Sequence, residues 1–236
     1  MRAGLHLKPG IIRCCLLFAL AAGCFLLTVV RWVITGRAAY FFLNWNLFLA
    51  AVPWFISLIL SSRFVIKKSK ILSVVLFIAW FLFFPNAPYL ITDLYYLRNH
   101  SGRMFWYDII MLFMFAWTGL LFGFFSLDLI EDMLARRLSR VKSAVITGGM
   151  LFVCAFGIYM GRYLRWNSWD VLFNLEELFQ DVFNRFIRPF SYVRTWGFTF
   201  LVGLFLNIFR WSIKLIVYEG YISRPKDKYL TDLKNP

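Results

Sequence analysis

Charged and amide side chains near the ends of apolar segments are the residues of this chain best suited to chemistry. Arg162 and Arg165 are three positions apart, a spacing that would place both side chains on one face of a helix. Two neighbouring guanidinium groups could bind a lipid phosphate through paired hydrogen bonds. The side chains that could orient them, or bond a ligand directly, are Asn86, Asp93, Asp108, Asn167 and Asp170. These seven residues form the candidate binding site.

The same residues admit other interpretations. The arginines and carboxylates could form ion pairs that only stabilise the fold. Asp93 or Asp108 could instead act as the general base of an enzyme. Together with Asp170 and His100, these carboxylates could also bind a hard cation. The sequence carries no zinc-protease, serine-hydrolase or P-loop motif, so we expect no metal and no cofactor.

Six apolar runs must position these side chains. The chain is 61% hydrophobic and 16% charged, whereas soluble domains are about 25% charged. About 20 apolar helical residues cross a bilayer, and long uncharged runs favour helices over the alternating strands of a barrel. We therefore predict an all-α polytopic transmembrane bundle, a single domain over residues 1–220 followed by a cytoplasmic tail over 221–236. The predicted spans cover residues of about 12–34, 42–62, 71–91, 105–127, 142–161 and 194–217.

The connection between the last two spans has its own pattern. Apolar residues recur there every three or four positions, which predicts an amphipathic helix over 168–188 lying in the membrane interface. Its polar face is acidic, and Pro189 ends the run. This helix could be a structural cover on the bundle or a lid over a pocket.

Charge predicts the orientation. Of the 26 Lys and Arg residues, 17 lie in the terminal segments and alternate loops that share one side, and 9 lie on the other. The positive-inside rule then places both termini in the cytoplasm and the seven candidate residues at the outer face. The net charge of +14 is spread among the loops rather than gathered on one face, which argues against binding nucleic acid.

Glycines predict close helix contacts. Gly119 and Gly123, and likewise Gly157 and Gly161, are four positions apart, the small-xxx-small spacing that lets helix backbones approach. We expect these contacts within one chain, with dimerisation as the alternative.

Four segments resemble a known family. Residues 44–50, 84–94, 106–108 and 157–170 are similar to an uncharacterised family of bacterial integral membrane proteins, domain of unknown function 1361. The resemblance runs from about Asn44 to Gly203. It implies a bacterial multi-pass membrane protein and supplies no catalytic residues.

These observations predict a binding protein rather than an enzyme. We expect a multi-pass protein of the bacterial plasma membrane whose outer-leaflet site engages a lipid headgroup. Membrane lipids are the expected partners, and another envelope membrane protein is the alternative. Two further hypotheses stay open: a membrane enzyme acting on an envelope lipid or glycan precursor, and a transporter subunit that needs a partner chain.

Overall fold

The computed structural model describes residues 9–62, 69–99 and 103–222. Within these residues the chain is helical and contains no strand, and six segments are long and apolar enough to cross a membrane. The predicted all-α bundle of six spans and one amphipathic helix is therefore confirmed. The long helices are α1 (Pro9–Thr35), α2 (Phe42–Ser61), α4 (Lys70–Phe83), α6 (Phe105–Ala135), α7 (Arg140–Tyr163) and α10 (Val193–Ile222). The predicted tail lies outside the described residues from position 223 onward.

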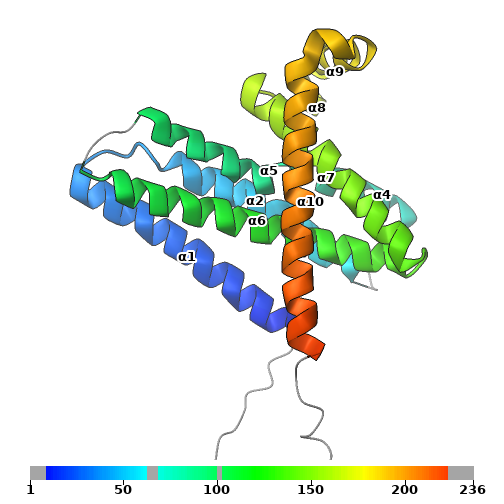
Figure 1. The fold of residues 1–236 in the computed structure, drawn as a ribbon, viewed down its shortest axis with the longest axis horizontal. Helices are drawn as coiled ribbons and strands as arrows, with labels where there is room; N and C mark the ends of the chain where they lie inside the picture. The colour runs from blue at the N-terminus through cyan, green and yellow to red at the C-terminus, as the bar shows by residue number, and fades with distance from the viewer. Residues whose placement is uncertain (1–8, 63–68, 100–102, 223–236) are drawn as a thin grey trace, which may run out of the picture.

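Helix α6 lies at the centre of the bundle (Figure 1). It packs against α1, α2, α7 and the segment 86–99 that follows α4. One buried cluster joins α1, α2 and α6 around Leu43, Met111 and Phe115. A second joins α4, α6, α7 and α10 around Trp80 and Leu127. Outward positions on these helices carry exposed Val, Ile, Leu and Phe side chains, as lipid-facing surfaces do.

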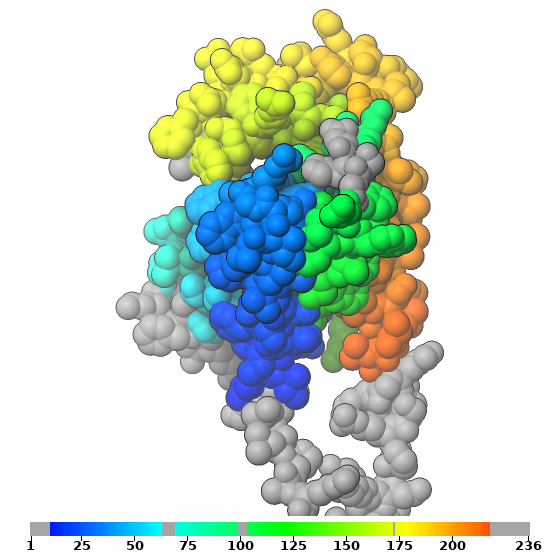
Figure 2. Space-filling view, turned by 90° about the vertical axis from the view of Figure 1, so that its left-hand side faces the viewer, coloured from blue at the N-terminus to red at the C-terminus, as the bar shows by residue number. Residues whose placement is uncertain are grey.

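The bundle has two distinct ends. The first residues of α1 and the last of α10 lie at the bottom of Figure 2, and we call this the terminal end. The opposite end, here called the site end, contains the end of α1, the start of α2, the end of α7 and the segment that joins α7 to α10. That segment forms the topmost layer in Figure 2. An even number of crossings brings the start of α1 and the end of α10 to the same end.

The third span is not one continuous helix. Helix α4 stops at Phe83 and is followed by the short α5 (Asn86–Tyr89) and the 3₁₀-helix η1 (Leu90–Asn99). Pro85 causes the break, because proline has no N–H to bond the preceding turn. The predicted span over 71–91 missed this change of helix type. Ten residues of 3₁₀-helix are unusual, because runs longer than three or four residues are uncommon.

Glycines let α5 lie close to its neighbours. A Cβ atom on Gly119 would lie 2.5 Å from the carbonyl oxygen of Ala87, and one on Gly157 would lie 2.9 Å from Cγ of Pro85. Neither position has room for a side chain. The close contacts expected from the glycine spacing are therefore confirmed within one chain: α6 and α7 both receive the broken part of the third span.

The amphipathic connection forms two helices instead of one. They are α8 (Asp170–Phe173) and α9 (Leu175–Ile187), followed by the 3₁₀ turn η2 (Pro189–Tyr192). Asn174 has φ −131° and ψ 42°, which interrupts the predicted helix over 168–188. Asparagine tolerates such a conformation because its helix propensity is low. The apolar face of α9 is largely exposed: Phe179 is 61% exposed and Phe183 50%.

Candidate functional site

A buried ion pair joins the third and fifth spans at the site end. Asp93 lies in η1 and is 1% exposed, and Nη1 of Arg162, near the end of α7, is 3.0 Å from its Oδ1 atom. Asn46 of α2 donates to the other carboxylate oxygen at 3.1 Å. Three helix ends therefore meet on one carboxylate, which brings two of the predicted site residues into direct contact.

Tyrosine rings surround the guanidinium group of Arg162. Its Cζ atom lies 5.8, 5.5 and 5.1 Å from the ring centroids of Tyr89, Tyr95 and Tyr96. These distances are typical of cation–π contacts. Nη1 also donates to the hydroxyl of Tyr89 at 3.5 Å. The charge of Arg162 is thus balanced by Asp93, and its guanidinium group is enclosed by aromatic rings. This arrangement suits a structural ion pair better than a phosphate-binding arginine.

Asp108 belongs to a second ion pair with a partner that the sequence analysis missed. Arg31, near the end of α1, donates from Nε to Oδ1 at 2.7 Å and from Nη2 to Oδ2 at 3.2 Å. The hydroxyl of Tyr40 donates to the same carboxylate at 3.3 Å. Asp108 is 1% exposed, so no open face is left to a general base. The sequence did contain a signal for this role of Arg31, because Arg31 lies near the end of an apolar run, as Arg162 does.

Two of the family-like segments meet at the break in the third span. The break leaves the carbonyl oxygens of Leu82 and Phe83 without their usual helical donors. The hydroxyl of Ser168 donates to Leu82 at 3.0 Å, and Nδ2 of Asn86 donates to Phe83 at 2.9 Å. Asn86 also donates to the hydroxyl of Ser168 at 3.0 Å. Ser168, in the turn after α7, therefore completes the backbone bonding of a helix whose Leu82 lies 86 residues earlier.

Three predicted site residues, Arg165, Asn167 and Asp170, follow the end of α7. Arg165 therefore does not share a helical face with Arg162. Helix α7 ends at Tyr163, and Arg165 has φ +61°, a left-handed conformation that is uncommon outside glycine. Arg165 is exposed, so the expected arginine pair with Arg162 is not formed. Asp170 accepts bonds from the backbone and side-chain nitrogens of Asn167, at 2.6 and 3.3 Å. This carboxylate caps its own turn.

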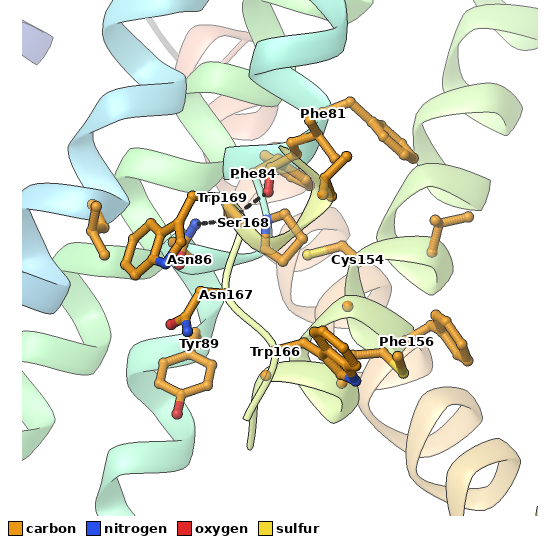
Figure 3. A pocket seen from close by; sticks show the side chains of 18 of the residues that line it. Phe81, Phe84, Asn86, Tyr89, Cys154, Phe156, Trp166, Asn167, Ser168 and Trp169 are labelled. Atoms are coloured by element: carbon orange, nitrogen blue, oxygen red, sulfur yellow. Dashed lines mark hydrogen bonds between the residues drawn. The ribbon is translucent and has the colours of Figure 1, made fainter. Parts of the chain in front are cut away.

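A cavity of about 400 Å³ lies beside this junction (Figure 3). Its walls come from α2, the α4–α5 break, α7, the turn after α7 and α9. Asn86, Asn167 and Tyr89 lie on one side in Figure 3, and Cys154 and Phe156 lie on the other. The cavity thus has a hydrogen-bonding wall and an apolar wall, which is the usual make-up of a small-molecule site.

Among the residues that the structure describes, no charged side chain lines this cavity. Its residues are aliphatic, aromatic, amide, hydroxyl, thiol or glycine, and Arg162 and Asp93 are not among them. The ion pair instead lies directly behind the wall, because Asn46 and Tyr89 each contact both the pair and the cavity. The pair therefore holds two wall residues in place without offering charge to a ligand.

A third ion cluster occupies the terminal end. Arg210 of α10 lies 2.9 Å from Oδ1 of Asp128 and also bonds Glu131 of α6, and Lys214 lies 2.8 Å from Glu131. The hydroxyl of Thr147 donates to Glu131 at 3.0 Å, so α7 joins the cluster. The sequence analysis treated this end as basic loops and missed the pairing. The cluster ties α10 to the bundle opposite the cavity.

The carboxylates that the alternative interpretation grouped into a cation site are separated by these contacts. Asp93, Asp108 and Asp170 each have a different partner. His100 lies outside the described residues. Over residues 9–62, 69–99 and 103–222, no three His, Cys, Asp or Glu side chains come close enough to hold a metal ion.

Comparison with known proteins gives the family and nothing more specific. The model of one family, described as a protein of unknown function (DUF1361), matches residues 45–209. No curated protein and no solved structure matches the chain. The match covers the ion pair of Asp93, the Asn86–Ser168 junction and every wall of the cavity. The chain therefore belongs to the DUF1361 family, whose activity is unassigned.

Proposed function

We propose that this protein binds a single membrane lipid with an uncharged headgroup in the cavity beside the broken third span. The observation that carries the proposal is the cavity itself: it is amphipathic and lined by no ionisable group except tyrosine and cysteine. Its volume falls within the range of about 300–1,000 Å³ that is typical of ligand sites.

The rim of the cavity favours a lipid over a water-soluble ligand. Trp45 of α2 is 57% exposed and Val153 of α7 is 49% exposed, and both line the cavity. They lie on helices that are apolar enough to span a membrane, so their exposed surfaces would face lipid tails. A lipid could then enter sideways, with a tail along the apolar wall and its headgroup against Asn86 and Asn167.

The arrangement favours an uncharged headgroup over the phosphate expected from the sequence. A phosphate is best bound by a cation on the cavity wall, and the described part of the chain places none there. The same geometry disfavours an enzyme that uses Asp93 or Asp108 as a base, because both carboxylates are buried against arginines. We keep phosphate binding as an outcome that the experiment can reveal.

We further propose that the protein lies in a bacterial plasma membrane with both termini in the cytoplasm. The excess of Lys and Arg on the terminal side supports this orientation. The cavity then opens in the outer leaflet, where membrane lipids are the natural partners and a second envelope protein is the alternative.

Filling the cavity tests the proposal. Leu178 and Val182 of α9 line it, so Leu178→Trp with Val182→Trp should occlude it. Phe179→Trp with Phe183→Trp is the matched control, because these neighbours on the same helix do not line the cavity and are exposed. Native mass spectrometry of detergent-purified protein should show one retained lipid in the wild type and the control, and none in the occluded variant.

The comparison also separates binding from folding. Both double variants should unfold within a few degrees of the wild type. Equal lipid retention by all three proteins would overturn the proposal, and retention of a phosphorylated lipid would overturn the uncharged headgroup.

A further inference from the structure

The hydrogen-bonding wall of the cavity presents amide acceptors that the protein itself leaves unused. Asn46 donates to Asp93, Asn86 donates to Phe83 and Ser168, and Asn167 donates to Asp170. Each side-chain nitrogen thus faces protein. Hydrogen bonds within the described residues engage none of the three amide Oδ1 atoms. A ligand that carries several hydrogen-bond donors would therefore find partners at this wall.

Two further polar groups of the wall donate to the protein. The hydroxyl of Ser168 donates to Leu82, and the indole N–H of Trp166 donates to Asp181 at 2.8 Å. What the wall adds to its amide acceptors is aromatic surface, from Trp45, Tyr89 and Trp169. Amide acceptors beside flat aromatic faces match a sugar ring, which carries hydroxyl donors on its edge and C–H groups on its faces.

An ammonium headgroup fits less well. Aromatic faces and carbonyl oxygens can hold a quaternary amine. In phospholipids, however, that amine is joined to a phosphate, and the wall offers the phosphate no cation. A plain diacylglycerol carries a single hydroxyl and would leave most of the acceptors unpaired. A hexose headgroup has several hydroxyl groups, enough to reach three amides.

We infer that the headgroup is a sugar, so that the cavity takes an uncharged glycolipid. This inference rests on the proposed lipid-binding function. The turn that carries Asn167 is held rigid by the left-handed Arg165 and by the bond from Trp166 to Asp181. Strained, well-anchored backbone of this kind is often found where a ligand is bound.

The test compares three lipids with identical acyl chains. Monoglucosyldiacylglycerol, diacylglycerol and phosphatidylglycerol are offered in turn to delipidated protein in mixed micelles, and binding is followed by native mass spectrometry and tryptophan fluorescence. We expect the glucolipid to bind about tenfold more tightly than diacylglycerol, as two added hydrogen bonds would give. Asn167→Ala should remove most of that preference and leave diacylglycerol binding unchanged. The matched control is Asn184→Ala, an exposed amide on α9 that does not line the cavity.

The outcomes separate the two proposals. Equal binding of glucolipid and diacylglycerol, both blocked by the Leu178→Trp and Val182→Trp pair, would overturn the sugar and keep the lipid site. Tightest binding of phosphatidylglycerol would overturn the sugar and the uncharged headgroup together. Binding of all three lipids that survives occlusion would overturn the lipid site itself. Thermal unfolding of Asn167→Ala close to that of the wild type guards against a folding defect.

Discussion

Two arginines link neighbouring spans at the site end through buried ion pairs. Arg31 and Arg162 lie near the ends of two different spans, and each is paired with a carboxylate that is 1% exposed. Sequence spacing could nominate Asp93, Asp108 and Arg162, because charges beside apolar runs are conspicuous. It could not say which carboxylate goes with which arginine, because pairing depends on the order of helices around the bundle. That order is set by packing contacts such as Gly119 against Ala87.

Removing one member of the Asp93–Arg162 pair should be costly. Asp93→Ala leaves the guanidinium of Arg162 buried without its counter-charge, and we expect the free energy of unfolding to fall by about 3–5 kcal/mol. Asp93→Leu combined with Arg162→Met should recover most of this loss, because no buried charge remains. SDS titration in mixed micelles measures both. The control is Glu176→Ala on exposed α9, expected to change stability by less than about 0.5 kcal/mol. A double variant as unstable as the single one would contradict this account.

Tyr40 should give a pH-dependent contribution. Burial, followed by the nearby Asp108 carboxylate, raises the pKa of Tyr40 from 10.0 to about 12. A raised pKa in the folded state means that the protonated tyrosine stabilises the fold fully below pH 10, and this contribution is lost as the pH rises towards 12. The difference in unfolding free energy between the wild type and Tyr40→Phe should therefore shrink between pH 10 and 12. A difference that stays constant over this interval would refute the assignment.

At the scale of the helices, the spacing of apolar residues predicted where spans and the amphipathic helix occur better than it predicted where a helix is interrupted. The three-and-four spacing correctly indicated an amphipathic helix in the connection after α7, and the apolar runs indicated the spans. The 3₁₀-helix from Leu90 to Asn99 and the interruption at Asn174 were not predicted. The third span leaves the α-helix at Pro85, and this break is stabilised by Ser168, which donates to the Leu82 carbonyl 86 positions earlier. A local pattern carries no information about such a distant donor.

Helix α9 provides an element-scale prediction. Phe179 and Phe183 stack at 5.6 Å between centroids on an exposed face, whereas Glu177 is exposed on the polar face. If that apolar face lies in the membrane interface, a spin label at position 179 should collide with dissolved oxygen, and one at 177 with a water-soluble nickel chelate. Both labels are introduced as cysteines after the four native cysteines are replaced by alanine. Equal nickel accessibility at the two positions would place α9 in water instead.

At the scale of the whole molecule, the two ends use charge differently. The site end holds three Arg–Asp pairs, Arg31–Asp108, Arg162–Asp93 and Arg185–Asp181, none of which lines the cavity. The terminal end holds the Arg210 and Lys214 cluster that joins α10 to α6. This asymmetry matches the distribution of basic residues in the loops, which reflects orientation rather than the fold. A cavity at the site end can reach outer-leaflet lipids only if that orientation is right.

The orientation can be measured directly. Glu177→Cys on α9 and Arg140→Cys at the start of α7 are both exposed and lie at opposite ends of the bundle. In cells that express each variant without the native cysteines, a membrane-impermeant maleimide should label position 177 in intact cells and position 140 only after permeabilisation. The positive-inside distribution is the physical reason, because loops rich in Lys and Arg stay on the cytoplasmic side. Labelling of position 140 alone in intact cells would show the opposite orientation, with both ends of the described chain outside. The cavity would then bind a lipid of the inner leaflet.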